Sequence, residues 1–230
     1  MSQATEYAVI VAGGSGTRMQ SDLPKQFLPI GGRPLLMHTL EAFHRYSEKV
    51  QIILVLPAAD MERWDALCEE HKFTLSHIRQ TGGNSRYQSV KRGLEKIDKE
   101  GLVAIHDGVR PFVLPDSIGA SFRLAAIHGS AVAAVRLKDS IRVTDKDTTR
   151  TVDRSQFRLI QTPQTFQVTL IKEAYTTVSE VGITDDASVA ERAGHRISLF
   201  EGSYENIKIT TPEDLYIGEA IYRKQLADQT

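Results

Sequence analysis

Cysteine is nearly missing from this chain, and so are the patterns that accompany it. Cys68 is the only cysteine among 230 residues, which excludes an internal disulfide framework and a cysteine-rich metal site. Its surroundings, "DALCEEH", are typical of a helix, so we expect Cys68 to be an inert packing residue. The seven histidines include no H-E-x-x-H spacing, which excludes the zinc-protease helix.

Long apolar runs and an excess of one charge are also missing. No stretch approaches the roughly 18 apolar residues that span a bilayer. The N-terminal "MSQATEYAVIVAGG" has neither the charged region nor the cleavage site of a secretory signal. With 28 basic and 29 acidic residues, nothing draws the whole chain to nucleic acid or to an anionic membrane. We expect a soluble, cytoplasmic protein that binds neither, in which any phosphate site depends on a few focused cations.

Short apolar runs alternate with helical patterns along the chain. The runs are nearly continuous, which is typical of parallel strands covered on both faces; the expected strands are 7–12, 50–56, 102–107 and 130–137. Helices are expected between them, from the apolar stripes Leu36, Leu40, Phe43 and Ile118, Phe122, Ala125, and over 58–71 and 85–98. This alternation predicts a three-layer α/β/α, Rossmann-like fold with a mostly parallel sheet, in a single domain over 1–230.

The segment 138–160 interrupts this alternation. Its flanks "SIRVT" and "TRTVDR" around "DKDT" indicate a hairpin that is too polar to face a core. Residues alone leave two interpretations open: a solvated surface hairpin, or a β-arm that projects and packs on a second copy. Helices near 169–179 and 186–194 and a strand at "RISLF" follow. Thr211, Pro212 and Asp214 then form a good start for a last helix.

A glycine-rich loop follows the first apolar run, in "VIVAGGSGTRMQSDLPKQFLPIGG" (9–32). Its spacing fits neither known phosphate loop, since Arg18 stands where a P-loop needs its second glycine and Met19 where a dinucleotide fingerprint needs its third. The loop still suits an anion, because glycines let backbone N–H groups approach it. A plain turn would gain nothing from Arg18 and Lys25, so we favour anion binding.

Several motifs in order carry a resemblance: "AGGSGTRM", "LPKQFLPIGGRPLLMHTLEAF", "GGNSRYQSVKRGL", "HDGVRPFV", "VDRSQFRLIQTPQTF", "TDDAS" and "NIKITTPEDL". With them the chain resembles the nucleotidyltransferases that activate phosphorylated sugars and polyols. Over essentially its whole length it is similar to the 2-C-methyl-D-erythritol 4-phosphate cytidylyltransferase family. The resemblance implies transfer of a cytidylyl group from CTP to this polyol phosphate for isoprenoid synthesis, with Mg²⁺ or another divalent cation. Ribitol 5-phosphate cytidylyltransferase is the nearest alternative, but "VDRS" and "TDDAS" favour the first family.

The same resemblance implies four catalytic cations. Arg18 and Lys25 would stabilise the charge on the α-phosphate and on the leaving pyrophosphate, while Arg154 and Lys208 would hold the substrate's own phosphate. In this family the arm crosses to a second subunit, which implies a homodimer with exchanged arms. The nucleotide would be bound by Ala12, Gly13, Gly14, Ser15, Gly16, Gly83, Asn84, Ser89 and Gly108.

Some of these positions also have a purely structural interpretation. Asn84 departs from the aspartate often found there, and "TGGNSR" could be only a turn that caps the next helix. Gly108 stands where alanine is frequent, a change compatible with close approach to ribose. Arg110 is expected to pair with a carboxylate at a corner, and "TDDAS", with Asp185, to start a helix.

The substrate-binding set adds two residues to the cations. By resemblance, Asp107 lies near the substrate hydroxyls, the ribose or the metal, and these three possibilities stay open. Ser140, where threonine is common, can still donate a hydroxyl hydrogen bond.

Overall fold

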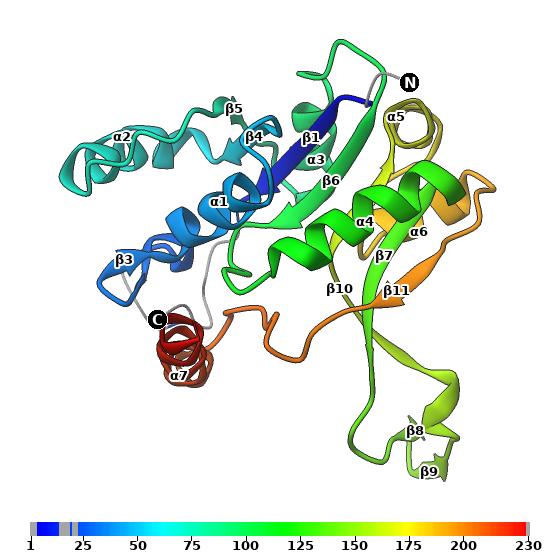
Figure 1. Ribbon diagram of the computed structural model, residues 1–230. Coiled ribbons are helices and arrows are strands. Elements are labelled where there is room, and N and C mark those ends of the chain that lie inside the picture. The colour runs from blue at the N-terminus through cyan, green and yellow to red at the C-terminus, as the bar shows by residue number, and fades with distance from the viewer. Residues whose placement is uncertain (1–3, 14–18, 20–22, 229–230) are drawn as a thin grey trace.

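A seven-stranded sheet runs through the protein, whose computed structural model describes residues 4–13, 19 and 23–228 (Figure 1). Every neighbouring pair of strands is parallel, except the two pairs that β10 makes with β6 and β7. In spatial order the strands are β11 (Leu199–Glu201), β7 (Ser130–Arg136), β10 (Arg158–Gln167), β6 (Leu102–Asp107), β1 (Glu6–Val11), β4 (Gln51–Leu56) and β5 (Ile78–Thr81).

Helices cover both faces of this sheet, which confirms the three-layer α/β fold. One face packs on α1 (Leu35–Tyr46), α2 (Met61–Glu70) and α4 (Pro115–His128). The other packs on α3 (Arg86–Leu94), α5 (Val168–Thr177) and α6 (Asp186–Arg192). Strand residues alternate between the two cores, so that Ile10 of β1 faces the first and Val9 the second.

A third, smaller core lies under the last helix, α7 (Pro212–Ala227). It is built on the short hairpin of β2 (Pro29–Ile30) and β3 (Arg33–Pro34), and Ile30 and Ile209 are fully buried in it. This packing fixes the segment before α7 beside the ends of β1 and β6.

The expected elements agree with the structure to within a few residues. The four predicted strands are β1, β4, β6 and β7. The helix expected over 85–98 is shorter, because α3 ends at Leu94 and the chain tightens there, with Ile97 N–H donating to Leu94 O at 3.1 Å. Two strands of the sheet, β5 and β10, were not predicted.

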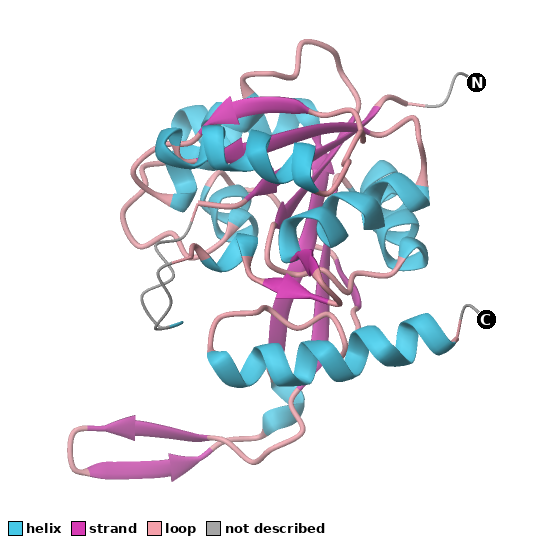
Figure 2. Ribbon diagram, turned by 90° about the vertical axis from the view of Figure 1, so that its left-hand side faces the viewer, coloured by secondary structure: helices cyan, strands magenta, loops and turns pink. Residues whose placement is uncertain are grey.

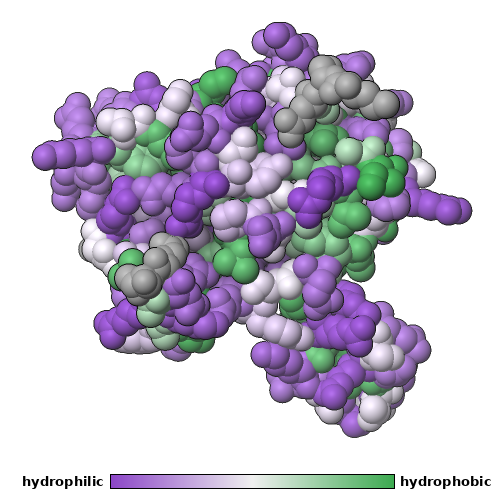
Figure 3. Space-filling model, in the orientation of Figure 1, coloured by the Kyte–Doolittle hydropathy of each residue, from purple (hydrophilic) through white to green (hydrophobic). Residues whose placement is uncertain are grey.

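The polar hairpin is formed by β8 (Arg142–Asp145) and β9 (Thr148–Thr151), and all eight residues are exposed. It projects away from the sheet (Figure 2) and forms a separate, mostly hydrophilic lobe (Figure 3). The projecting arm is shorter than the expected 138–160, because residues 158–160 belong to β10 and pair with 134–136 of β7. The short 3₁₀ helix η4 (Arg154–Gln156) lies between the hairpin and β10.

Local chemistry explains the starts of two late helices. Asp185 precedes α6, and its Oδ1 accepts a hydrogen bond from Ser188 N–H at 3.0 Å, which confirms "TDDAS" as a helix start. At α7, Asp214 Oδ2 accepts from Thr211 N–H at 2.8 Å.

Cys68 is half-buried against the core under α2, as expected of a packing residue. Burial, with the nearby Asp65 carboxylate, raises the pKa of the Cys68 thiol to about 11, so the thiol stays protonated and unreactive. Among the helices of the described residues, none is both long and apolar enough to cross a membrane.

Candidate active site

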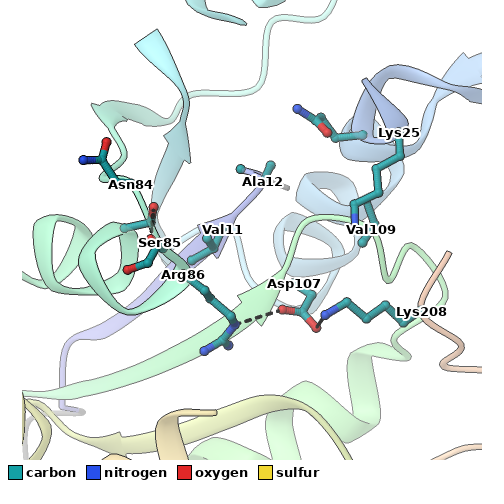
Figure 4. Close-up of a pocket in the computed structure, with 12 residues that line it drawn as sticks. Val11, Ala12, Lys25, Asn84, Ser85, Arg86, Asp107, Val109 and Lys208 are labelled. Atoms are coloured by element: carbon teal, nitrogen blue, oxygen red, sulfur yellow. Dashed lines mark hydrogen bonds and ion pairs between the residues drawn. The ribbon is translucent and has the colours of Figure 1, made fainter. Parts of the chain in front are cut away.

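A cavity of about 430 Å³ opens at the carboxyl ends of β1 and β6 (Figure 4). This is the edge where ligands bind in parallel α/β sheets, as the sequence predicts. Segments far apart in the chain line it: Val11, Ala12, Gly13, Lys25, Gln26, Asn84, Ser85, Arg86, Ser89, Asp107, Val109 and Lys208.

The glycine loop starts at the rim of this cavity. Ala12 N–H donates to Val55 O at 2.9 Å, which extends the pairing of β1 by one residue, and the exposed Gly13 follows. Lys25 enters from the 3₁₀ helix η2 (Lys25–Phe27), and its side chain extends into the cavity in Figure 4. Four predicted residues lie outside the described ones, so their roles stay predictions: Gly14, Ser15, Gly16 and Arg18.

The loop before α3 combines a structural turn with cavity-lining side chains. Ser85 caps α3, its Oγ accepting from Gln88 N–H at 3.1 Å, which confirms the capping turn. Ser89 Oγ accepts from Gly83 N–H at 3.1 Å, and a Cβ at position 83 would lie 2.3 Å from that of Gln88. Glycine is therefore required by packing here, while Asn84 and Ser89 are among the residues that line the cavity.

Gly108 has a packing role of the same kind. A Cβ at this position would lie 2.8 Å from the Cβ of Ala12 and 3.0 Å from Leu36 Cδ1. Its N–H donates to Val11 O at 2.8 Å, which holds the ends of β1 and β6 together. Packing alone accounts for the glycine, and its contact with a ribose stays a prediction.

Asp107, at the end of β6, gathers three cations around a nearly buried carboxylate. Its Oδ1 lies 3.4 Å from Nε of Arg86, and its Oδ2 lies 3.0 Å from Nζ of Lys208 and 3.3 Å from Nε of Arg110. Burial alone would raise the pKa of this carboxyl, but the three cations, Arg86 foremost, lower the pKa well below its ordinary value. The group is ionised at neutral pH, and its partners leave positive charge for an anionic ligand. The expected corner salt bridge of Arg110 is confirmed.

A second cavity, of about 280 Å³, adjoins the first and shares Arg86, Asp107 and Lys208 with it. Its other lining residues are mostly polar: Arg110, Ile160, Gln161, Thr162, Gln164, Thr184 and Asp185. Hydroxyl, amide and carboxylate groups of this kind suit a ligand rich in hydroxyls. Two ligands could therefore lie side by side and meet at the Asp107–Lys208 pair.

Two predicted residues stay away from both cavities of their own chain. Ser140 precedes the hairpin and Arg154 lies in η4, and both are exposed. The Arg154 guanidinium donates to the carbonyl of Lys138. One chain by itself therefore brings Lys25, Asp107 and Lys208 together but leaves out the two arm residues.

The residues around Asp107 can be tested against Mg²⁺. Within the described ranges, no three Asp, Glu, His or Cys side chains are grouped as a metal site. Asp107 is a single carboxylate with three cations beside it. Mg²⁺ is commonly held by one or two carboxylates together with substrate phosphates. These residues therefore fit a metal that is carried mainly on a phosphate chain, and the role of Asp107 toward it stays a prediction.

Of the charged residues that line the first cavity, Arg86 is the one that the sequence did not single out. Its terminal nitrogens Nη1 and Nη2 donate to Oδ1 and Oδ2 of Asp186 at 3.0 and 2.6 Å, while its Nε faces Asp107. Both partners lie in quoted motifs, "GGNSR" and "TDDAS", but nothing in their spacing shows that they meet.

Comparison with known proteins gives one consistent match. The family model described as 2-C-methyl-D-erythritol 4-phosphate cytidylyltransferase matches residues 7–224. A protein of that name from Bacteroides thetaiotaomicron is 50% identical over 213 residues, which is 93% of this chain and 97% of that protein. Another from Geobacillus kaustophilus is 39% identical over 224 residues, 96% of this chain and 98% of that protein.

Solved structures agree with the sequence match. The 4-diphosphocytidyl-2C-methyl-D-erythritol synthase of Anaerococcus prevotii superposes with a TM-score of 0.83 at 31% identity, covering 96% of each chain. The 2-C-methyl-D-erythritol 4-phosphate cytidylyltransferase of Thermus thermophilus superposes with a TM-score of 0.78 at 31% identity, covering 96% of this chain and 99% of that one.

Proposed function

Because this chain belongs to the 2-C-methyl-D-erythritol 4-phosphate cytidylyltransferase family, we infer that its two adjoining cavities carry out the family reaction. The protein is an enzyme that transfers the cytidylyl group of CTP to 2-C-methyl-D-erythritol 4-phosphate. The products are 4-diphosphocytidyl-2-C-methyl-D-erythritol and pyrophosphate, and the pathway leads to isoprenoid precursors. The carrying observation is the family match over 7–224, which includes every described residue that lines the cavity.

The reaction requires positively charged side chains rather than a general base. A phosphomonoester has its second pKa near 6, so at neutral pH it is largely a dianion and already a nucleophile. One of its oxygens attacks the α-phosphorus of CTP as the bond to the β-phosphate oxygen breaks and pyrophosphate leaves. The barrier is repulsion between two anions, which positive side chains lower by positioning and charge stabilisation.

The first cavity is our proposed site for CTP and for the cationic side chains that act on it. We propose that the triphosphate lies against the backbone from Ala12 to Gly16, with Lys25 and Arg18 stabilising the α-phosphate and the leaving group. Gly83, Asn84, Ser89 and Gly108 are proposed for the nucleoside. Support comes from Lys25 and Asn84, which line this cavity together with Ala12 and Gly13.

The second cavity is our proposed site for the polyol phosphate. Asp107 would accept from its hydroxyls and Lys208 would bind its phosphate, since both residues line the two cavities. Arg154 and Ser140 would reach this phosphate from the arm of a second copy in a homodimer. Support comes from exposed apolar side chains on and beside the arm, which a partner could cover: Val143 (38% exposed), Phe157 (42%), Leu159 (53%) and Ile160 (41%).

The divalent cation is proposed to be Mg²⁺, bound mainly through the CTP phosphates with Asp107 as its protein ligand. When bound, it would offset negative charge on the phosphates. We place the reaction in the cytoplasm, because CTP is a substrate. Neither nucleic acid nor a membrane takes part in this reaction.

The test is pyrophosphate release by the purified protein with CTP, with and without Mg²⁺, using 2-C-methyl-D-erythritol 4-phosphate or ribitol 5-phosphate. We expect turnover that requires the divalent ion and a strong preference for the methylerythritol substrate. A preference for ribitol 5-phosphate would establish the alternative function. If pyrophosphate is released with neither of the two polyol phosphates, the proposed cytidylyltransferase activity is refuted.

A further inference from the structure

Arg86 joins two carboxylates from different elements: Asp186 at the start of helix α6 and Asp107 at the end of strand β6. Its two terminal nitrogens are both used by Asp186 of α6, at 3.0 and 2.6 Å, so only Nε is directed to Asp107, at 3.4 Å. The side chain is 28% exposed, whereas that of Asp186 is fully buried. Burial alone would lower the pKa of Arg86, but the carboxylates of Asp186 and Asp107 raise it.

Asp186 is itself held by a second donor. The hydroxyl of Tyr175, on α5, donates to Asp186 Oδ1 at 2.6 Å. Burial, and then the Asp186 carboxylate, raises the pKa of Tyr175, so the hydroxyl keeps the proton that it donates. The Asp186 carboxylate therefore accepts three hydrogen bonds in a dry environment, a rigid arrangement that fixes the plane of the Arg86 guanidinium.

This arrangement determines which side chains can pair with Asp107, where the two cavities share Arg86, Asp107 and Lys208. With its terminal nitrogens occupied, Arg86 cannot form a two-pronged pair with Asp107, and Oδ2 of Asp107 stays available to Lys208 at 3.0 Å. We propose that Asp186 is a positioning residue of the transfer reaction: through Arg86 it sets Asp107 and hence Lys208 at the junction of the cavities. The inference rests on the proposed function, since Lys208 is there taken to bind the polyol phosphate.

The test is Asp186→Asn, which keeps size and shape but removes the charge and one acceptor. Arg86 is then expected to turn both terminal nitrogens to Asp107 and displace Lys208. The KM for the polyol phosphate should rise about tenfold or more, while the KM for CTP changes by less than about threefold. Should this variant not fold, Arg86→Lys serves instead. It keeps the charge but cannot hold both carboxylates, and we expect the same split between the two KM values.

Ser121→Ala is the matched control for lost stability. Ser121 is fully buried on α4, on the opposite face of the sheet, and its hydroxyl takes part in a buried hydrogen bond with Thr165 at 2.8 Å. Its removal should lower Tm while both KM values stay unchanged. If Asp186→Asn and Ser121→Ala lose the same Tm and also show the same change in the KM for the polyol phosphate, Asp186 is only structural. That result would overturn the proposal.

A double-mutant cycle decides whether Asp186 acts through Arg86. Asp186→Asn should cost about tenfold in kcat/KM in the wild-type background and less than about twofold in the Arg86→Lys background. Equal costs in the two backgrounds would refute the coupling.

A crystal structure of Asp186→Asn tests the inference without activity. We expect the Arg86 guanidinium to move onto Asp107 and Lys208 to leave it. An unchanged Asp107–Lys208 pair would overturn the proposal even if the wild-type enzyme turns over CTP. An inactive wild-type protein, by contrast, would refute the proposed function and with it the part that Asp186 plays in the transfer, whereas this crystal structure decides whether the Asp107–Lys208 pair depends on Asp186.

Discussion

Lys208 Nζ lies 3.0 Å from Oδ2 of Asp107, which ties the segment before α7 to the end of β6. The Lys208 side chain is 38% exposed and that of Asp107 is 10% exposed, so the pair joins a buried floor to an open cavity. A phosphate that enters the second cavity can therefore approach the exposed ammonium without removing Asp107 from its other partners, Arg86 and Arg110.

Lys208→Ala should weaken binding of the polyol phosphate. Loss of one charge-assisted contact is expected to raise the KM for 2-C-methyl-D-erythritol 4-phosphate about tenfold or more, with the KM for CTP nearly unchanged. Initial rates of pyrophosphate release measure both constants. Lys224→Ala is the control, because Lys224 is an exposed lysine of α7 paired with Glu205. A rise in the KM for CTP alone would assign Lys208 to the nucleotide.

Lys25→Ala should act on kcat rather than on nucleotide binding. A cation that stabilises charge developing in the transition state contributes about 10²–10³ in rate, so kcat should fall by this factor. Calorimetric titration with CTP should still show binding within about fivefold of wild type, since backbone contacts remain. The Lys224→Ala variant again serves as control. Pyrophosphate release at the wild-type rate would contradict the role given to Lys25.

Arg154→Ala and Lys25→Ala should complement each other if the arm works in a partner's site. In an equal mixture about half of the dimers are mixed, and each mixed dimer holds one intact site of two, so about a quarter of wild-type activity should return. Arg150→Ala, an exposed arginine of β9, is the control that should stay active. Absence of rescue, with mixed dimers shown by native mass spectrometry, would contradict a site shared between two chains.

His106 should make stability fall in weak acid. It is fully buried, its Nε2 donates to Arg110 O at 3.1 Å, and burial lowers its pKa to about 4. The unfolded chain takes up a proton near pH 6.5, which the folded protein refuses until about pH 4, so stability is full above pH 6.5 and declines between these values. From pH 7 to pH 5 the loss should be roughly 2 kcal/mol.

Urea unfolding of the wild type and of His106→Leu at pH 7 and at pH 5 measures this loss of stability. The decline should be smaller in the variant by roughly that amount, because the partly buried His38 and His77 contribute equally in both proteins. An equal decline in the two proteins would show that His106 is not the group responsible.

Sequence alone predicts the strands whose side chains are almost all apolar. Both faces are buried in β1, β4, β6 and β7, and their nearly continuous apolar runs therefore predict strands. β10 does not, since it buries polar residues whose partners are distant: Gln164 donates to Asp185 at 2.9 Å and Thr165 to Ser121 at 2.8 Å. No local pattern indicates that such a strand is buried, and β5 is mostly exposed.

In the site, too, some residues could be predicted from the sequence and others could not. Lys25 behind a glycine loop and Asp107 at a strand end could be placed by spacing and by the rule for parallel sheets. Lys208 came only from the family resemblance. The Arg86–Asp186 pair is a tertiary contact between α3 and α6, and two opposite charges in separate motifs do not reveal that they are buried together.

The most direct measurement is a crystal structure of this protein with Mg²⁺ and a non-hydrolysable CTP analogue. The triphosphate should lie in the cavity along Ala12 and Gly13, with the Lys25 ammonium within hydrogen-bonding distance of its oxygens. A triphosphate bound elsewhere, with Lys25 turned to solvent and the cavity at the ends of β1 and β6 unused, would contradict the assignment of this site.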